Sequence, residues 1–170
     1  MRHIIFVLCI ASLAAAGCSR RREDYSVSGL MKMLQQGDAA ARYSAVSGLK
    51  GYGPEAKPAV ALLTQALKDT DRNVCIEAAY ALAAIGPDAE SALPRLLEML
   101  KSPDNDLRLA GAYAVPVVGI RSNTALPLIK SLLNDRDPRV RAEAASGLRK
   151  LQLAARFKNM AATASTAATK

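Results

Sequence analysis

The chain is poor in the side chains that carry most enzyme chemistry. Tryptophan is absent, aromatic residues make up 4%, and the only histidine is His3. The rest of the chain therefore offers no imidazole for a general base, an activated nucleophile or a metal ligand. It has no glycine-rich phosphate loop, and Cys75 alone cannot form a thiolate zinc site. We predict a non-enzymatic protein with no catalytic residue, no cofactor and no metal ligand.

The formal net charge of +8 is not spread along the chain. Between Leu30 and Leu148 there are 14 Lys and Arg residues and 13 Asp and Glu residues. The excess of positive charge therefore lies at the two ends of the chain. A nucleic-acid-binding protein needs basic residues that follow one face, usually with aromatic residues between them. The sequence therefore favours a protein partner and no nucleic acid.

The first 17 residues differ from the rest. Ile4 to Leu13 is an apolar run, too short to span a membrane, followed by small residues. We interpret residues 1–17 as a signal peptide and 18–26 as a polar tether. Three cysteines are too few for a disulfide framework, because Cys9 lies in this leader and Cys75 lacks a partner.

The segment Ala15-Ala16-Gly17-Cys18 resembles the lipobox of bacterial lipoproteins, although Ala15 stands where leucine is usual. This resemblance implies lipid attachment at Cys18 and membrane association through that anchor, in the bacterial cell envelope and facing the periplasm. Ser19 in place of aspartate favours the outer membrane. The alternative is cleavage after Ala14-Ala15-Ala16, which would release a secreted or periplasmic soluble protein.

One pattern recurs every 33 residues from about residue 27 onward. Its markers are four aspartates and two apolar columns, at Asp38, Asp71, Asp104 and Asp137, at Leu49, Leu82, Val115 and Leu148, and at Leu34, Leu67, Leu100 and Leu133. A fixed period of this length indicates a solenoid, whose units bury their apolar faces only when stacked. The columns are predicted to form its core.

Helix signals alternate within each unit. Apolar stripes at helical spacing are separated by Gly53-Pro54 and Gly86-Pro87, the expected end of one helix and start of the next. An unpaired helix around Leu30 opens the array. Pro116 is predicted to end or bend its helix about one turn early. After Met160 the chain is mainly Ala, Thr and Ser, so 159–170 is predicted to be a disordered tail.

The unit pattern is Asp-x-x-Val/Leu-Arg-x-x-Ala-Ala-x-x-Leu, then Gly-Pro, then Ala-Leu-Pro-x-Leu, as in 137–148, 86–87 and 92–96. It resembles the HEAT-like repeats of the phycobilisome lyase type. The resemblance implies an all-α fold, an α-solenoid of about four helical hairpins over 27–158. It also implies a structural ladder of helix-capping aspartates paired with neighbouring arginines, formed by Asp38, Asp71, Asp104, Asp137, Arg42, Arg108 and Arg141. Cys75 replaces the arginine in the second unit.

Polar positions also recur along the second helix of each hairpin. They form two stripes with one neighbouring lysine, at Lys32, Gln65, Glu98 and Ser131, at Gln35, Lys68, Lys101 and Asn134, and at Lys130. In the HEAT-like family second helices usually line the concave face, so these residues are a candidate groove for a protein partner; the alternative is a solvated helix face. We predict a scaffold or interaction module. An accessory subunit of a lyase-like enzyme is the alternative that the family resemblance suggests.

Overall fold

The computed structural model describes residues 25–121 and 125–168. Within these ranges all regular secondary structure is helical, and short turns connect the helices. The helix α1 (Val27–Gln36) precedes four longer first helices, which are α2 (Ala39–Tyr52), α4 (Arg72–Ile85), α6 (Asn105–Val118) and α8 (Pro138–Ala168). The second helices are short, and a 3₁₀ segment accompanies each of them: η1 (Gly53–Ala59) with α3 (Val60–Ala66), η2 (Gly86–Ala92) with α5 (Leu93–Met99), and α7 (Ala125–Ser131) with η3 (Leu132–Asn134).

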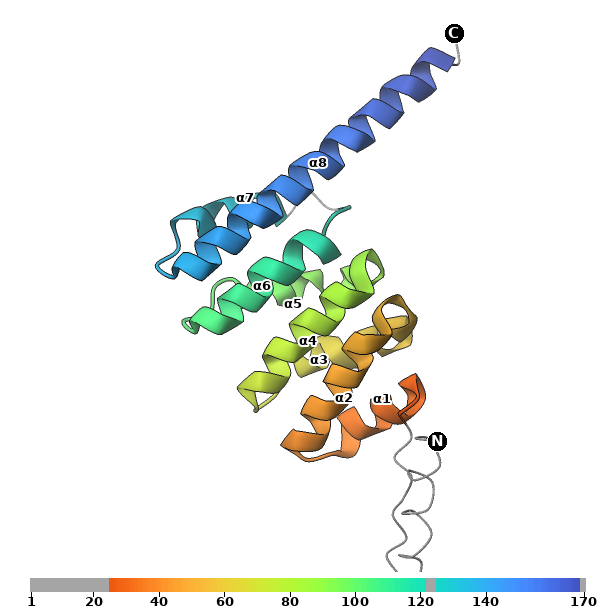
Figure 1. The fold of residues 1–170 in the computed structure, drawn as a ribbon, viewed down its shortest axis with the longest axis vertical. Helices are drawn as coiled ribbons and strands as arrows, with labels where there is room; N and C mark the ends of the chain where they lie inside the picture. Colours follow the sequence, from red (N-terminus) through yellow and green to blue (C-terminus); the bar gives the residue numbers. More distant parts are fainter. Residues whose placement is uncertain (1–24, 122–124, 169–170) are drawn as a thin grey trace, which may run out of the picture.

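The helices form two layers (Figure 1). The first helices α2, α4, α6 and α8 lie side by side in chain order, and α3, α5 and α7 form a second layer behind them. Each first helix packs against the first helix of the next unit. This stacking of successive helical hairpins is an α-solenoid, as the period of the sequence predicts.

The core runs along the array between the two layers. Leu49, Leu82 and Val115 are fully buried, as are their neighbours from the second layer, Leu63 and Leu96. The prediction for the apolar column of Leu34, Leu67, Leu100 and Leu133 is wrong at Leu133. This side chain is exposed, and the adjacent Leu132 is buried instead. The reason is local: α7 ends at Ser131 and a tighter 3₁₀ turn follows, which rotates the next side chains.

Two glycines make the turns inside the first two hairpins. Gly53 and Gly86 have φ angles of 56° and 82°, in the region that favours glycine. Pro54 and Pro87 follow them and begin the 3₁₀ segments, where a missing N–H is tolerated. The sequence pair Gly-Pro thus ends one helix and starts the next.

Pro116 does not end α6 early, contrary to prediction. The helix continues to Val118, and the Gly119 N–H still donates to the carbonyl of Val115. Pro116 is fully buried against Gly147 of α8, where a Cβ atom would lie 2.4 Å from the proline Cγ. The lost backbone hydrogen bond falls in the last turn of the helix, and Gly147 provides the space for the ring.

The helix α8 is more than twice as long as the other first helices. It continues to Ala168 and projects beyond the array, in place of the disordered tail expected over 159–170 (Figure 1). Alanine has the highest intrinsic helix propensity, and the segment after Met160 contains no Pro or Gly to stop a helix that has already begun. Propensity therefore extends the helix without a core to pack against.

Candidate partner-binding face

All nine residues predicted to bind a partner are exposed. They lie in or directly after the second-layer helices, at Lys32 and Gln35 of α1, Gln65 and Lys68 at the end of α3, Glu98 and Lys101 at the end of α5, and Lys130, Ser131 and Asn134 in α7 and η3. We call this surface the second-helix face. The 33-residue period places equivalent positions of successive units next to one another along it.

Neighbouring units meet at two points of this face. Gln35 and Gln65 line one shallow hollow of ≈250 Å³ between α1 and α3, together with Leu62. Lys68 and Glu98 approach to 3.6 Å, which joins the ends of α3 and α5. Ser131 differs, because its hydroxyl donates to the carbonyl of Leu128 within its own helix.

Arg95 also belongs to this face, although it was not among the predicted residues. Its guanidinium donates to the Glu98 carboxylate at 3.0 Å. This hydrogen bond is the main cause that lowers the pKa of Glu98, and Lys68 adds to it. The spacing of three residues between Arg95 and Glu98, typical of side chains that meet on a helix, was the available signal.

The second-helix face carries an excess of positive charge. With Arg95 included, its charged side chains are one carboxylate and five cations, at Glu98 and at Lys32, Lys68, Arg95, Lys101 and Lys130. Two of the cations already contact Glu98. The remaining three lysines leave this face basic although the array as a whole is close to neutral.

The four ladder aspartates all accept hydrogen bonds at helix starts. Asp38 accepts from the Ala41 N–H, Asp71 from Asn73, Asp104 from Asp106 and Leu107, and Asp137 from Arg139. These bonds satisfy N–H groups that have no partner within the helix. The four aspartates therefore cap the first helices. Their regular recurrence every 33 residues was the signal in the sequence for this role.

The arginine partners in the ladder differ from the expected ones. Arg42 forms a bidentate ion pair with Asp69, at 2.7 Å, and Arg108 does the same with Asp135, at 2.8 Å. The predicted pairing with the capping aspartates is wrong by two residues, because the turns before α4 and α8 place their earlier carboxylates, Asp69 and Asp135, opposite the arginines. Arg141 donates only to backbone carbonyls of the preceding turn, at Asp135 and Arg136.

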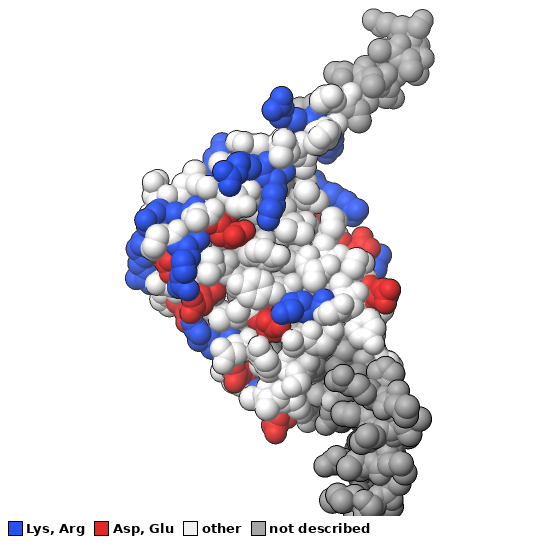
Figure 2. All heavy atoms as spheres, in the orientation of Figure 1, with Lys and Arg blue, Asp and Glu red and all other residues white. Residues whose placement is uncertain are grey.

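A second charged network lies over the exposed starts of the first helices. Arg72 of α4 bonds to Asp104 and Asp106 at the start of α6, and Arg139 of α8 reaches Asp106 at 2.9 Å. Figure 2 shows charged side chains gathered at this edge, beside a largely uncharged middle of the first-helix layer. The network joins three units, so these residues hold the array together.

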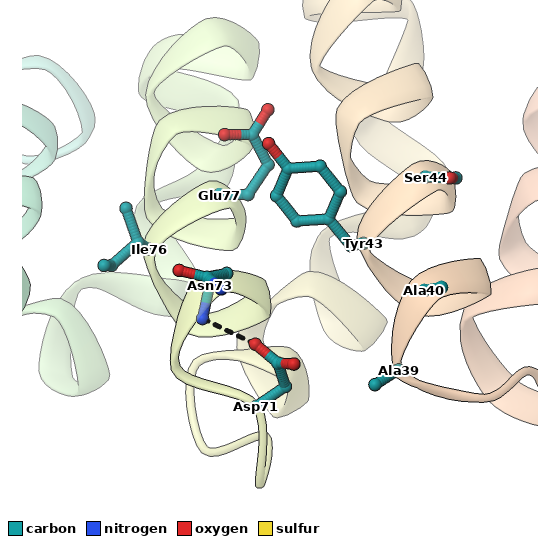
Figure 3. A pocket seen from close by; sticks show the side chains of 8 residues that line it. All are labelled: Ala39, Ala40, Tyr43, Ser44, Asp71, Asn73, Ile76 and Glu77. Atoms are coloured by element: carbon teal, nitrogen blue, oxygen red, sulfur yellow. Dashed lines mark hydrogen bonds between the residues drawn. The ribbon is translucent and has the colours of Figure 1, made fainter.

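A further hollow lies between α2 and α4 (Figure 3). It measures ≈610 Å³, and small residues such as Ala39, Ala40 and Ser44 leave space beside Tyr43. Its two carboxylates already have partners, since Asp71 caps α4 and the buried Glu77 binds the Lys50 ammonium at 2.5 Å. No pattern in the sequence indicated this hollow, which lies where small side chains of α2 face larger side chains of α4.

The described residues contain no group of three or more His, Cys, Asp and Glu side chains placed to hold a metal ion. Cys75 is buried, and burial raises the pKa of its thiol, which disfavours the reactive thiolate. Across 25–121 and 125–168, no helix has the length and apolar character that a membrane span requires. Cys18 and the predicted signal peptide lie outside the described residues.

The fold and this exposed face define a helical-repeat solenoid. A family model described as HEAT repeats matches residues 27–116, and a second model, HEAT repeat, matches 125–154. The chain belongs to the HEAT repeat family.

Two solved structures are similar to the chain. One is an engineered protein, with a TM-score of 0.64 and 25% identity over 75% of this chain and 63% of that chain. The other is a designed armadillo repeat protein in complex with the peptide (KR)4, with a TM-score of 0.63 and 21% identity over 74% and 64% of the two chains. The chain spans less than two thirds of either structure. No curated protein sequence matches it significantly.

Proposed function

We propose that the protein is a non-enzymatic interaction module that holds a protein partner on its second-helix face. The observation that carries this proposal is the exposure of all nine predicted residues in or directly after the second-layer helices of successive units. A HEAT repeat array offers a long surface made of similar units, which suits an extended partner segment. The likeness to a designed repeat protein that holds a peptide supports this use of the fold.

The charge of the face indicates an acidic partner segment. Five cations against one carboxylate would attract negative charge, and the three lysines without a carboxylate partner on this face lie in three different units. An extended segment with acidic residues at intervals could contact Lys32, Lys101 and Lys130 in turn. Binding of this kind weakens as the salt concentration rises.

Copurification with chemical crosslinking from native membranes tests the proposal. The variant Lys32→Glu/Lys101→Glu/Lys130→Glu should lose the partner that the unchanged chain captures, because it reverses the charge of the face. Lys57→Glu/Arg121→Glu/Lys158→Glu is the matched control, with the same charge change at exposed positions outside this face. Circular dichroism checks that both remain folded. Equal capture by both variants would place the partner on another surface.

We further propose that the module is exported and attached to the periplasmic side of a bacterial membrane through lipid on Cys18. The support is the apolar leader followed by Ala15-Ala16-Gly17-Cys18. A lipid anchor would concentrate the second-helix face near the membrane. Mass spectrometry of the chain isolated from membranes tests this attachment: a mature chain that begins at a lipid-modified Cys18 supports the anchor, and an unmodified Cys18 contradicts it.

A further inference from the structure

The last part of α8 lies outside the packed array. The first helices α2, α4 and α6 each contain 14 residues, and the equivalent part of α8 ends at Leu151. Leu151 is buried and is the last core residue among the side chains that the structure describes. From Gln152 to Ala168 the helix continues for about 25 Å beyond the edge of the array (Figure 1).

This projecting segment carries an exposed apolar stripe. Leu153, Phe157 and Met160 have exposed fractions of 51%, 67% and 65%, and their spacing of four and three residues places them on one side of the helix. Leu151 precedes the stripe by two residues, which is about half a helical turn. Since Leu151 faces the array, the stripe faces away from it and does not continue the core.

Positive charge surrounds the stripe. No Asp or Glu follows Glu143, whereas the rest of the chain contains five cations, at Arg149, Lys150, Arg156, Lys158 and Lys170. Arg149 and Arg156 lie four residues before and three residues after Leu153, so they border the stripe, and the three line one hollow of ≈490 Å³. Lys150 instead contacts the Tyr113 ring and Glu143.

We propose that the projecting part of α8 binds an anionic lipid surface. Leu153 and Phe157 enter the boundary between headgroups and acyl chains, and Arg149 and Arg156 contact headgroup phosphates. A helix with large apolar side chains on one side and bordering cations has the composition of an interfacial helix. A further stacked unit or a second copy on the end of the array would cover 138–151, which leaves the stripe uncovered. This inference depends neither on the partner proposal nor on Cys18.

Tryptophan fluorescence gives a local test, because the chain contains no tryptophan. In the full chain, Phe157→Trp should show blue-shifted emission and quenching by brominated acyl chains when vesicles of phosphatidylglycerol and phosphatidylcholine are added. Vesicles of phosphatidylcholine alone should give little change. Adding Arg149→Glu and Arg156→Glu should weaken the response about tenfold in lipid concentration. The signal reports residue 157, so attachment through residues 1–24 does not produce it.

The control is Lys158→Trp, which is exposed, lies off the stripe and does not line the hollow beside Leu153, so it should remain in water and unquenched. The proposal is wrong if Phe157→Trp emission does not respond to anionic vesicles, or if it responds equally to neutral ones. It is also wrong if the two tryptophans respond alike. A blue shift that grows with protein concentration without lipid would identify a second copy of the chain as the occupant instead.

Discussion

In the first and third units an arginine of the first helix pairs with the carboxylate 27 positions later in the chain, whereas the second unit lacks this pair and reaches the next turn through Arg72 instead. Arg42 binds Asp69 and Arg108 binds Asp135, with 27 residues between the partners in both cases. At the equivalent positions the second unit has Cys75 and Ser102. The thiol donates to the Asp69 carbonyl at 3.2 Å, and Ser102 accepts from the Asp104 N–H, so both side chains have backbone partners.

This difference shows that the arginine and its carboxylate are replaced as a pair. In all three turns the side chain at 69, 102 or 135 accepts a hydrogen bond from the N–H two residues later. The local turn therefore needs only an acceptor, and serine is sufficient. The charge of the carboxylate is needed only where an arginine faces it, since a buried charge without a partner is costly.

The largest effect is expected at the more buried ion pair. The side chains of Arg108 and Asp135 are 7% and 8% exposed, against 22% and 10% for Arg42 and Asp69. Arg108→Ala should lower the free energy of unfolding by about 3 kcal/mol, because Asp135 loses its partner. Urea unfolding measures the loss. Arg141→Ala, which removes only bonds to backbone carbonyls, is the control, and an equal loss there would contradict this explanation.

Introducing the ion pair into the second unit tests the pairwise replacement. Cys75→Arg alone should destabilise the array, because Ser102 provides no carboxylate. Adding Ser102→Asp should recover stability, with a coupling of about 1–3 kcal/mol between the two changes. A double-mutant cycle by urea unfolding measures it. Additive effects would show that the two positions do not act as a pair.

Removing the hydrogen bonds of a capping aspartate should cause a smaller loss of stability, and this part of the loss should be similar in each unit. Asp104→Ala removes hydrogen bonds to the Asp106 and Leu107 N–H groups together with the partly exposed ion pair to Arg72, and should cost about 1–2 kcal/mol. Asp104→Asn keeps an acceptor at the same place and should recover part of the loss. Thermal unfolding compares the two variants. A transition unchanged by Asp104→Ala would remove the capping role.

The smallest difference should appear in the pH dependence. The hydrogen bond from Arg108 lowers the pKa of Asp135, and that from Arg42 lowers the pKa of Asp69. A lowered pKa in the folded state gives stability above the unfolded pKa of about 4, which is lost as the pH falls through the folded pKa. Unfolding temperatures measured from pH 6 to pH 2 should therefore fall less steeply for Asp135→Asn than for the unchanged chain.

The repeat pattern was sufficient to predict the architecture. The period, the Gly-Pro turns and the capping aspartates depend on local chemistry that recurs in each unit, so the fold and the exposed positions of the second-helix face follow from them. The arginine partners could not be predicted, because Asp69 and Asp71 share one turn and only the three-dimensional path distinguishes them. The continuation of α8 was missed because composition indicated disorder where alanine propensity extends a helix.

The contact between Pro116 and Gly147 limits how the array could be rebuilt. The equivalent pairs at the earlier interfaces are Lys50 with Ala81 and Ala83 with Ala114, so glycine stands opposite the one proline. Elongating the array by duplicating its third unit would bring Ala114 against Pro116, where even a methyl group has no space. The units of this protein thus share one fold, but the side chains that face each other across each interface are specific to that interface. A protein with reordered or added units must therefore change both residues of such a pair together.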